Sequence, residues 1–151
     1  SPSYLKTVSM SELYDTVFNV QTPLIDGLLQ RGTYIFAGSP KVGKSFMMTQ
    51  LAYHISTGTP LWGYKVRKST VLYFAIVHHT RKQKAEDIFD MISGTNGLMG
   101  AADGAFVLSK EKRTSNNAIL DVAGRDQQDM KIHLVRDAEK LIWNFEKSET
   151  E

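Results

Sequence analysis

The spacing of apolar residues divides the chain into two halves that predict different structures. In the first half, an apolar run at 33–37 leads into a glycine-rich turn, and an apolar-periodic stretch at 46–56 then predicts a helix. Residues 57–60 contain a glycine and a proline and predict the end of that helix. The run at 71–77 has no polar alternation, which predicts a strand buried on both faces. Strand, helix and strand together predict one right-handed crossover unit.

The second half predicts short strands. Four apolar runs lie between polar turns, at 105–108, 118–122, 131–135 and 141–145. We expect the last two runs to form an antiparallel hairpin. This pattern predicts a sheet that is mainly antiparallel at its C-terminal side.

Three further segments complete the pattern. Ser11 predicts the start of a short capped helix that continues to Phe18. Residues 82–92 have the spacing of an amphipathic helix, and residues 93–104 contain four glycines and predict a loop. On the helix at 46–56, one face is expected to be buried. Its apolar residues are Phe46, Met47, Leu51, Ala52 and Ile55.

Composition places the chain among ordinary globular proteins. Its 151 residues predict a single domain, with an N-terminal arm at 1–23, a strand–helix–strand unit at 24–77 and a C-terminal portion at 78–151. The net charge of +2 does not by itself indicate a polyanionic partner, and the absence of cysteine excludes disulfides and thiolate metal sites. No apolar run approaches the ~18 residues of a membrane span, and residues 1–6 lack an apolar signal core. By default we expect a cytoplasmic protein without a membrane partner.

The turn after the first strand carries the chemistry. Gly38, Gly43, Lys44 and Ser45 occupy every fixed position of the phosphate-binding loop pattern, between a predicted strand and a predicted helix. Backbone amides of such a turn point inward, and the helix dipole favours an anion. Lys44 is then expected to neutralise the β- and γ-phosphates, and Ser45 to hold Mg²⁺. The expected binding residues are Gly38, Ser39, Pro40, Lys41, Val42, Gly43, Lys44, Ser45 and Phe46.

This motif predicts ATP or ADP with Mg²⁺ as the ligand, although no motif indicates which base is preferred. Residues 24–75 also resemble the start of the RecA-like ATPase core, closest to plasmid- and phage-type RepA-like helicases and their AAA-type relatives. Residues 77–145 resemble the end of the same core. The segments that carry the resemblance are 28–32, 41–45 and 58–63 in the first stretch, and 77–82, 93–95, 100–103 and 122–126 in the second.

The resemblance implies an α/β fold, a three-layer P-loop sandwich with a reduced, mixed sheet and an antiparallel C-terminal strand set. It also implies a homo-oligomer, and single-stranded DNA as a partner. The loop at 93–104 is where relatives contact DNA, yet it has no lysine, arginine or aromatic side chain. The basic cluster at 110–113 is the alternative surface for DNA.

The centre of the family's core has no counterpart in this chain. In the family, an acidic residue that polarises water follows the strand that matches 71–75, and a later strand ends in the Asp of the Mg²⁺ shell. Here Ala75 leads instead to His78 and His79. Phosphoryl transfer depends on positioned water and neutralised charge, so we expect nucleotide binding with weak or absent hydrolysis. Whether the chain is an ATPase stays open at this stage.

Several side chains are candidates for the missing chemistry. The resemblance suggests that His78 or His79 senses the γ-phosphate. A shared metal ion is disfavoured, because adjacent strand residues point to opposite faces. The resemblance also suggests Arg113, with Lys112 second, as a basic finger that reaches a neighbouring subunit's nucleotide. The alternative for this pair is a solvated turn.

Three weaker candidates remain. Glu86 and Asp90 share one face of a predicted helix and are candidates to replace the missing carboxylates. A solvated face is the favoured interpretation, because Arg81, Lys82 and Lys84 lie one turn upstream. Arg125 is expected either to pair with Asp126 or Asp129 or, like Arg113, to serve a neighbouring subunit's nucleotide.

Three functions stay open. The first is nucleotide binding by a reduced RecA-like domain, with weak or absent hydrolysis. The second is an active ATPase or helicase-like DNA replication motor that works as an oligomer. The third is a self-associating scaffold with swapped strands, because the absence of central strands leaves unpaired sheet edges.

Overall fold

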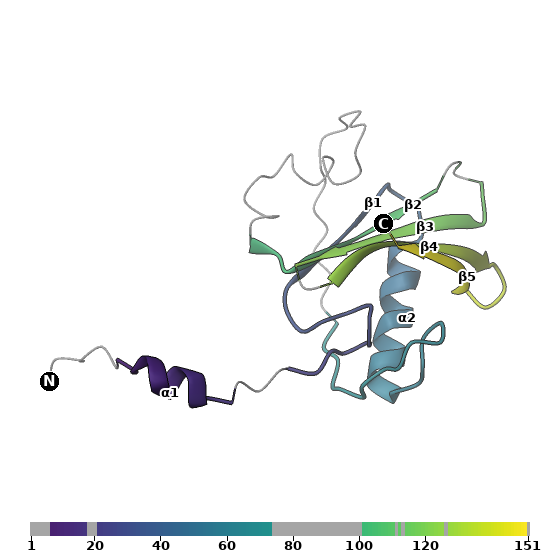
Figure 1. Ribbon diagram of the computed structural model, residues 1–151. Coiled ribbons are helices and arrows are strands. Elements are labelled where there is room, and N and C mark those ends of the chain that lie inside the picture. Colours follow the sequence, from purple (N-terminus) through teal and green to yellow (C-terminus); the bar gives the residue numbers. More distant parts are fainter. Residues whose placement is uncertain are drawn as a thin grey trace, which may run out of the picture.

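In the part of the chain that the structure describes, a five-stranded mixed sheet with one long helix on one face forms the body of the protein (Figure 1). The computed structural model describes residues 7–17, 21–73, 101–110, 112, 114–125 and 127–150. Its elements are α1 (Met10–Asp15), β1 (Tyr34–Gly38), α2 (Lys44–Thr57), β2 (Gly104–Ser109), β3 (Asn117–Gly124), β4 (Gln127–Asp137) and β5 (Ile142–Thr150).

The strands lie in the sheet in the order of the sequence. β1 and β2 are parallel, with Gly38 opposite Leu108, and every later pair is antiparallel. The sheet is therefore mixed, and the four expected C-terminal strands are present, the last two as an antiparallel hairpin. We call the edge at which β1, β2 and β4 end, and β3 and β5 begin, the carboxyl edge.

The core lies between α2 and the face of the sheet that α2 covers. Met47 and Leu51 of α2 pack with alternate residues of the strands, among them Phe106 and Leu108 of β2. The other face carries a smaller cluster around Ala105 and Val107, the intervening residues of β2. Because side chains alternate along a strand, β2 contributes to both clusters. The expected three-layer sandwich appears as two layers in the part of the chain that the structure describes.

The helix α2 lies where the sequence predicts one, but it begins two residues before and ends one residue after the expected stretch at 46–56. It ends at the C-cap Gly58, whose φ of 75° is left-handed and whose amide donates to the carbonyl of His54. Its buried residues are Met47, Gln50 and Leu51. The expected apolar face is thus confirmed at Met47 and Leu51, whereas Gln50 was not expected on it.

The sequence placed the first helix slightly wrongly. Its N-cap is Ser9, two residues before the expected Ser11, and α1 ends at Asp15. Ser9 and Glu12 form a capping box, in which the Ser9 side chain accepts from the Glu12 amide and the Glu12 carboxylate accepts from the Ser9 amide. Spacing explains the difference, because the capping box needs an acidic residue three positions after the cap and Ser11 has Tyr14 there.

The expected strand at 71–77 is wrong where the structure describes it. Val71, Leu72 and Tyr73 are not in a strand, and Leu72 is 91% exposed. The parallel neighbour of β1 is β2 instead. The remainder of this run, the expected helix at 82–92 and most of the loop at 93–104 lie outside the described residues. Neither described helix has the length and apolar character needed to cross a membrane.

Candidate functional site

A tight loop connects Gly38 at the end of β1 to Lys44 at the start of α2, at the carboxyl edge. We call it the phosphate loop, because its sequence predicts phosphate binding. Lys41 and Gly43 have φ angles of 62° and 106°, both in the left-handed region. Left-handed residues in a short turn direct successive amides to one side, which is the backbone arrangement of an anion-binding nest. The loop ends at Gly43, the N-cap of α2, so the positive end of the helix dipole faces the same side.

Gly38 allows the loop to start close to the neighbouring strand. A Cβ atom at this position would lie 2.4 Å from the carbonyl oxygen of Leu108 on β2. That separation is shorter than any real contact, so only glycine fits while β1 and β2 keep their register. The motif's first glycine therefore has a packing reason in this chain.

Lys44 lies back over the loop. Its Nζ donates to the carbonyl of Gly38 at 2.7 Å and to that of Ser39 at 2.9 Å. Partial burial lowers the pKa of Lys44 below its ordinary value, because a less hydrated ammonium is less favourable. An ammonium has three N–H donors, so two are engaged by the loop itself.

The first turn of α2 adds further donors. Because helical bonds run from residue i to i−4, the amides of Lys44, Ser45 and Phe46 have no acceptor within the helix. The amide of Met47 is the first to bond, to the carbonyl of Gly43. Ser45 is exposed in this turn, where its hydroxyl can reach a ligand.

Trp143 of β5 packs against the loop, a contact that no sequence motif indicates. Its indole Nε1 lies 3.4 Å from the carbonyl of Gly43, and a Cβ at Gly43 would lie 2.8 Å from the ring. Gln50 of α2 fixes the main chain of Trp143, since the Gln50 side chain donates to its carbonyl at 2.9 Å and accepts from its amide at 2.7 Å. Trp62 donates to the same carbonyl. The buried Trp143 thereby ties the loop to α2 and β5.

The remaining predicted site residues do not belong to the motif of the phosphate loop. Lys112 is exposed in the β2–β3 turn, which lies at the carboxyl edge. His78, His79, Glu86, Asp90 and Arg113 lie outside the described residues.

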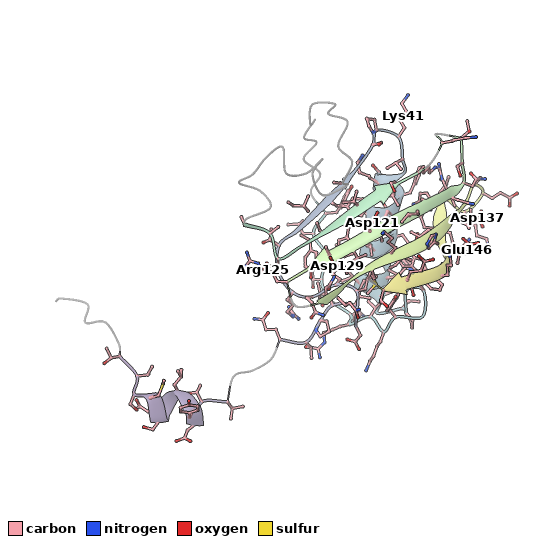
Figure 2. The ribbon with its side chains drawn as sticks, turned by 45° about the horizontal axis from the view of Figure 1, so that its top comes forward. Lys41, Asp121, Arg125, Asp129, Asp137 and Glu146 are labelled. Atoms are coloured by element: carbon pink, nitrogen blue, oxygen red, sulfur yellow. The ribbon has the colours of Figure 1, made fainter. Side chains whose placement is uncertain are left out.

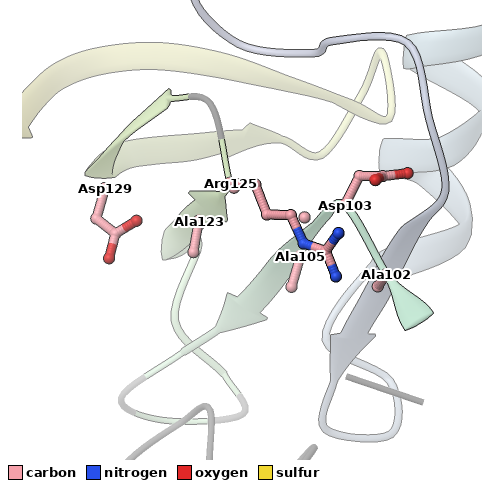
Figure 3. Close-up of a pocket in the computed structure, with 8 residues that line it drawn as sticks. Ala102, Asp103, Ala105, Ala123, Arg125 and Asp129 are labelled. Carbon is pink, nitrogen blue, oxygen red and sulfur yellow. The ribbon is translucent and has the colours of Figure 1, made fainter. Parts of the chain in front are cut away.

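Arg125 lies away from the phosphate loop of its own chain, and its expected roles, pairing with Asp126 or Asp129 or reaching a neighbouring subunit's nucleotide, stay predictions. It follows the C-terminal end of β3, at the opposite end of the sheet from Lys41 of the loop (Figure 2). A shallow hollow of about 290 Å³ lies there, lined among others by Asp103, Arg125 and Asp129 (Figure 3). Asp103 connects the residues that come just before β1 and β2, because its Oδ2 accepts a hydrogen bond from the amide of Thr33 at 2.7 Å. Because β3 runs antiparallel to β2, its last residue, Gly124, lies beside the start of β2, and Arg125 follows it there.

Acidic groups are separate from the loop in the described part of the chain. No described carboxylate hydrogen-bonds or ion-pairs with residues 38–46. The Oδ1 of Asp137, at the carboxyl edge, accepts instead from the amides of Glu139 and Lys140. Among the described residues, no three His, Asp or Glu side chains gather closely enough to hold a metal ion.

Comparison with known proteins agrees with the class of domain that the loop suggests. A family model described as an AAA domain matches residues 1–76, just over half of the 151 residues. The chain therefore belongs to the AAA domain family. The matched part contains β1, the phosphate loop and α2. No curated protein and no solved structure matches the chain.

Proposed function

We propose that the protein binds ATP or ADP with Mg²⁺ at the loop of residues 38–46. The observation that carries this proposal is the position of Lys44, whose ammonium lies over a left-handed turn at the start of α2. A phosphate that enters the turn meets both the first amides of α2, which have no acceptor within the helix, and the positive end of the helix dipole. Membership of the AAA domain family supports the same class of ligand.

In this proposal each group has a role. Lys44 leaves the carbonyls of Gly38 and Ser39 and binds the β- and γ-phosphates. The hydroxyl of Ser45 holds Mg²⁺, and the amides from Gly43 to Phe46 surround the β-phosphate. Bound phosphate also removes the cost of partial burial of Lys44, because an anion beside an ammonium favours its charged form.

We propose further that hydrolysis is weak or absent. Phosphoryl transfer needs a group that orients the attacking water and a carboxylate that helps to hold Mg²⁺. No described carboxylate forms a hydrogen bond or an ion pair with residues 38–46. Asp137, the acidic residue that ends β4, is engaged by its own turn. Binding without efficient turnover is the function that these residues support best.

Nucleotide titration of matched variants tests the proposal. Lys44→Ala should weaken the binding of a fluorescent ATP analogue by at least about tenfold, since a charge-assisted hydrogen bond is lost. Arg67→Ala is the control, because Arg67 is exposed near the C-terminal end of α2. Phosphate release by the parent should stay close to the rate without protein. Equal affinity of Lys44→Ala and parent would reject the binding site, and rapid release that Lys44→Ala abolishes would reject weak hydrolysis.

A further inference from the structure

Two cations outside the motif lie beside the phosphate loop. Lys110 comes directly after β2, the strand next to β1, and Arg136 is near the end of β4. Both positions are therefore at the carboxyl edge. The Lys110 side chain lies over the ring of Trp143, which belongs to the core, and the Arg136 side chain lies over the ring of Phe46 in α2. Both side chains are therefore on the face of the sheet that α2 covers.

Each of these cations lies over an aromatic ring that adjoins the loop. The Nζ of Lys110 is 5.3 Å from the centre of the Trp143 ring, which itself packs against Gly43. The guanidinium carbon of Arg136 is 4.6 Å from the centre of the ring of Phe46, the residue after Ser45. Cation–π contacts of this kind hold a charge in place while leaving its N–H donors available.

Among the described residues, no acidic side chain balances the charges of the pair. Neither Lys110 nor Arg136 forms a salt bridge within the described part of the chain. The Nε of Arg136 is buried and has no hydrogen-bond partner there. Burial and then repulsion from Arg136 lower the pKa of Lys110. A buried donor without an acceptor and two adjacent like charges both cost free energy, and a bound anion relieves both costs.

We propose that Lys110 and Arg136 are additional binding residues that contact the phosphates of the nucleotide. This inference rests on the proposed function and extends its site from the motif to the ends of β2 and β4. It predicts a ligand with several negative charges, since three cations then surround one site. Nucleic-acid phosphate has the same chemistry, but Lys110 and Arg136 are only partly exposed and lie beside the loop, which favours a small polyphosphate.

Calorimetric titration with Mg²⁺–ATP tests this assignment on the full chain. Lys110→Gln and Arg136→Gln should each weaken binding by about tenfold, the effect of one charge-assisted hydrogen bond. Lys110→Arg and Arg136→Lys, which keep the charge, should stay within about threefold of the parent. Arg67→Gln removes one positive charge near the far end of α2 and should bind like the parent.

The outcomes separate this inference from the proposed function. If the parent binds and both glutamine variants bind equally well, the role of the pair is rejected while the loop remains the site. If the parent itself does not bind, both proposals fail. If the glutamine variants keep their ATP affinity but lose binding to a single-stranded oligothymidine, the pair serves nucleic acid and the inference is overturned. Should Arg136→Gln not fold, Lys110→Gln alone decides.

Discussion

At the scale of single residues, the loop depends on backbone conformations that few residues adopt. Gly38 and Gly43 were predictable from the motif, because glycine is required where the chain turns sharply beside a phosphate. Their packing reasons were not predictable. Gly43 is covered by Trp143, which is 100 residues away in sequence, and no local pattern reports such a contact. The same holds for Lys110 and Arg136, which only the sheet topology brings to the loop.

Replacing Gly43 by alanine separates strain from packing. Gly43→Ala combines a left-handed φ of 106° with a Cβ that would lie 2.8 Å from the Trp143 ring. Gly63→Ala is the matched control, since its φ is 85° and no atom lies within 4 Å of the added Cβ. Urea denaturation should show Gly43→Ala less stable than Gly63→Ala by about 1–3 kcal/mol, the cost of overpacking. Equal losses would mean that the ring does not press on Gly43.

At the scale of elements, one polar side chain connects α2 to the last hairpin. The pattern of apolar residues predicted α2 and β5 separately, because each has its own periodicity. It did not predict their contact, since an analysis of apolar spacing treats Gln50 as a solvent-facing residue. In the fold Gln50 is 9% exposed and forms two hydrogen bonds with the main chain of Trp143. Because Trp143 packs against Gly43, the contact with Gln50 also positions the phosphate loop.

Gln50→Ala should therefore be strongly destabilising. It removes both hydrogen bonds and leaves the buried amide of Trp143 without an acceptor, at a cost of about 2–4 kcal/mol. The neighbouring Thr49→Ala is the control, because Thr49 is exposed and bonds only within its own helix. Its expected effect is below about 0.5 kcal/mol. Denaturation of the two variants in parallel measures the difference, and similar losses would rule out the proposed link between α2 and β5.

At the scale of the whole molecule, the sheet in the described part of the chain is narrower on the β1 side than the sequence predicted. The run at 71–77 has the composition of a buried strand, but composition does not say which neighbour a strand pairs with. In the described part of the chain β2 is the parallel partner of β1, and Leu72 is exposed. The four C-terminal strands were predictable, because short runs between polar turns form hairpins that need no distant partner.

Paired leucine substitutions test this architecture. Leu72→Ala should change stability by less than about 0.5 kcal/mol, because the side chain is 91% exposed. Leu61→Ala should cost about 2–5 kcal/mol, because Leu61 is 1% exposed and belongs to the core beneath the sheet. Unfolding by urea measures both changes. A large loss for Leu72→Ala would mean that 71–73 is a buried strand after all, as the sequence alone suggested.

The most direct measurement of the central claim is a two-dimensional amide NMR titration of the full chain with Mg²⁺–ADP. If the loop binds the phosphates, the amide signals of Gly43, Lys44, Ser45 and Phe46 should shift most and should saturate with one ligand per chain. The same titration of Lys44→Ala should leave them nearly unmoved. Saturable binding that does not shift these amides, or no binding at all, would contradict the account.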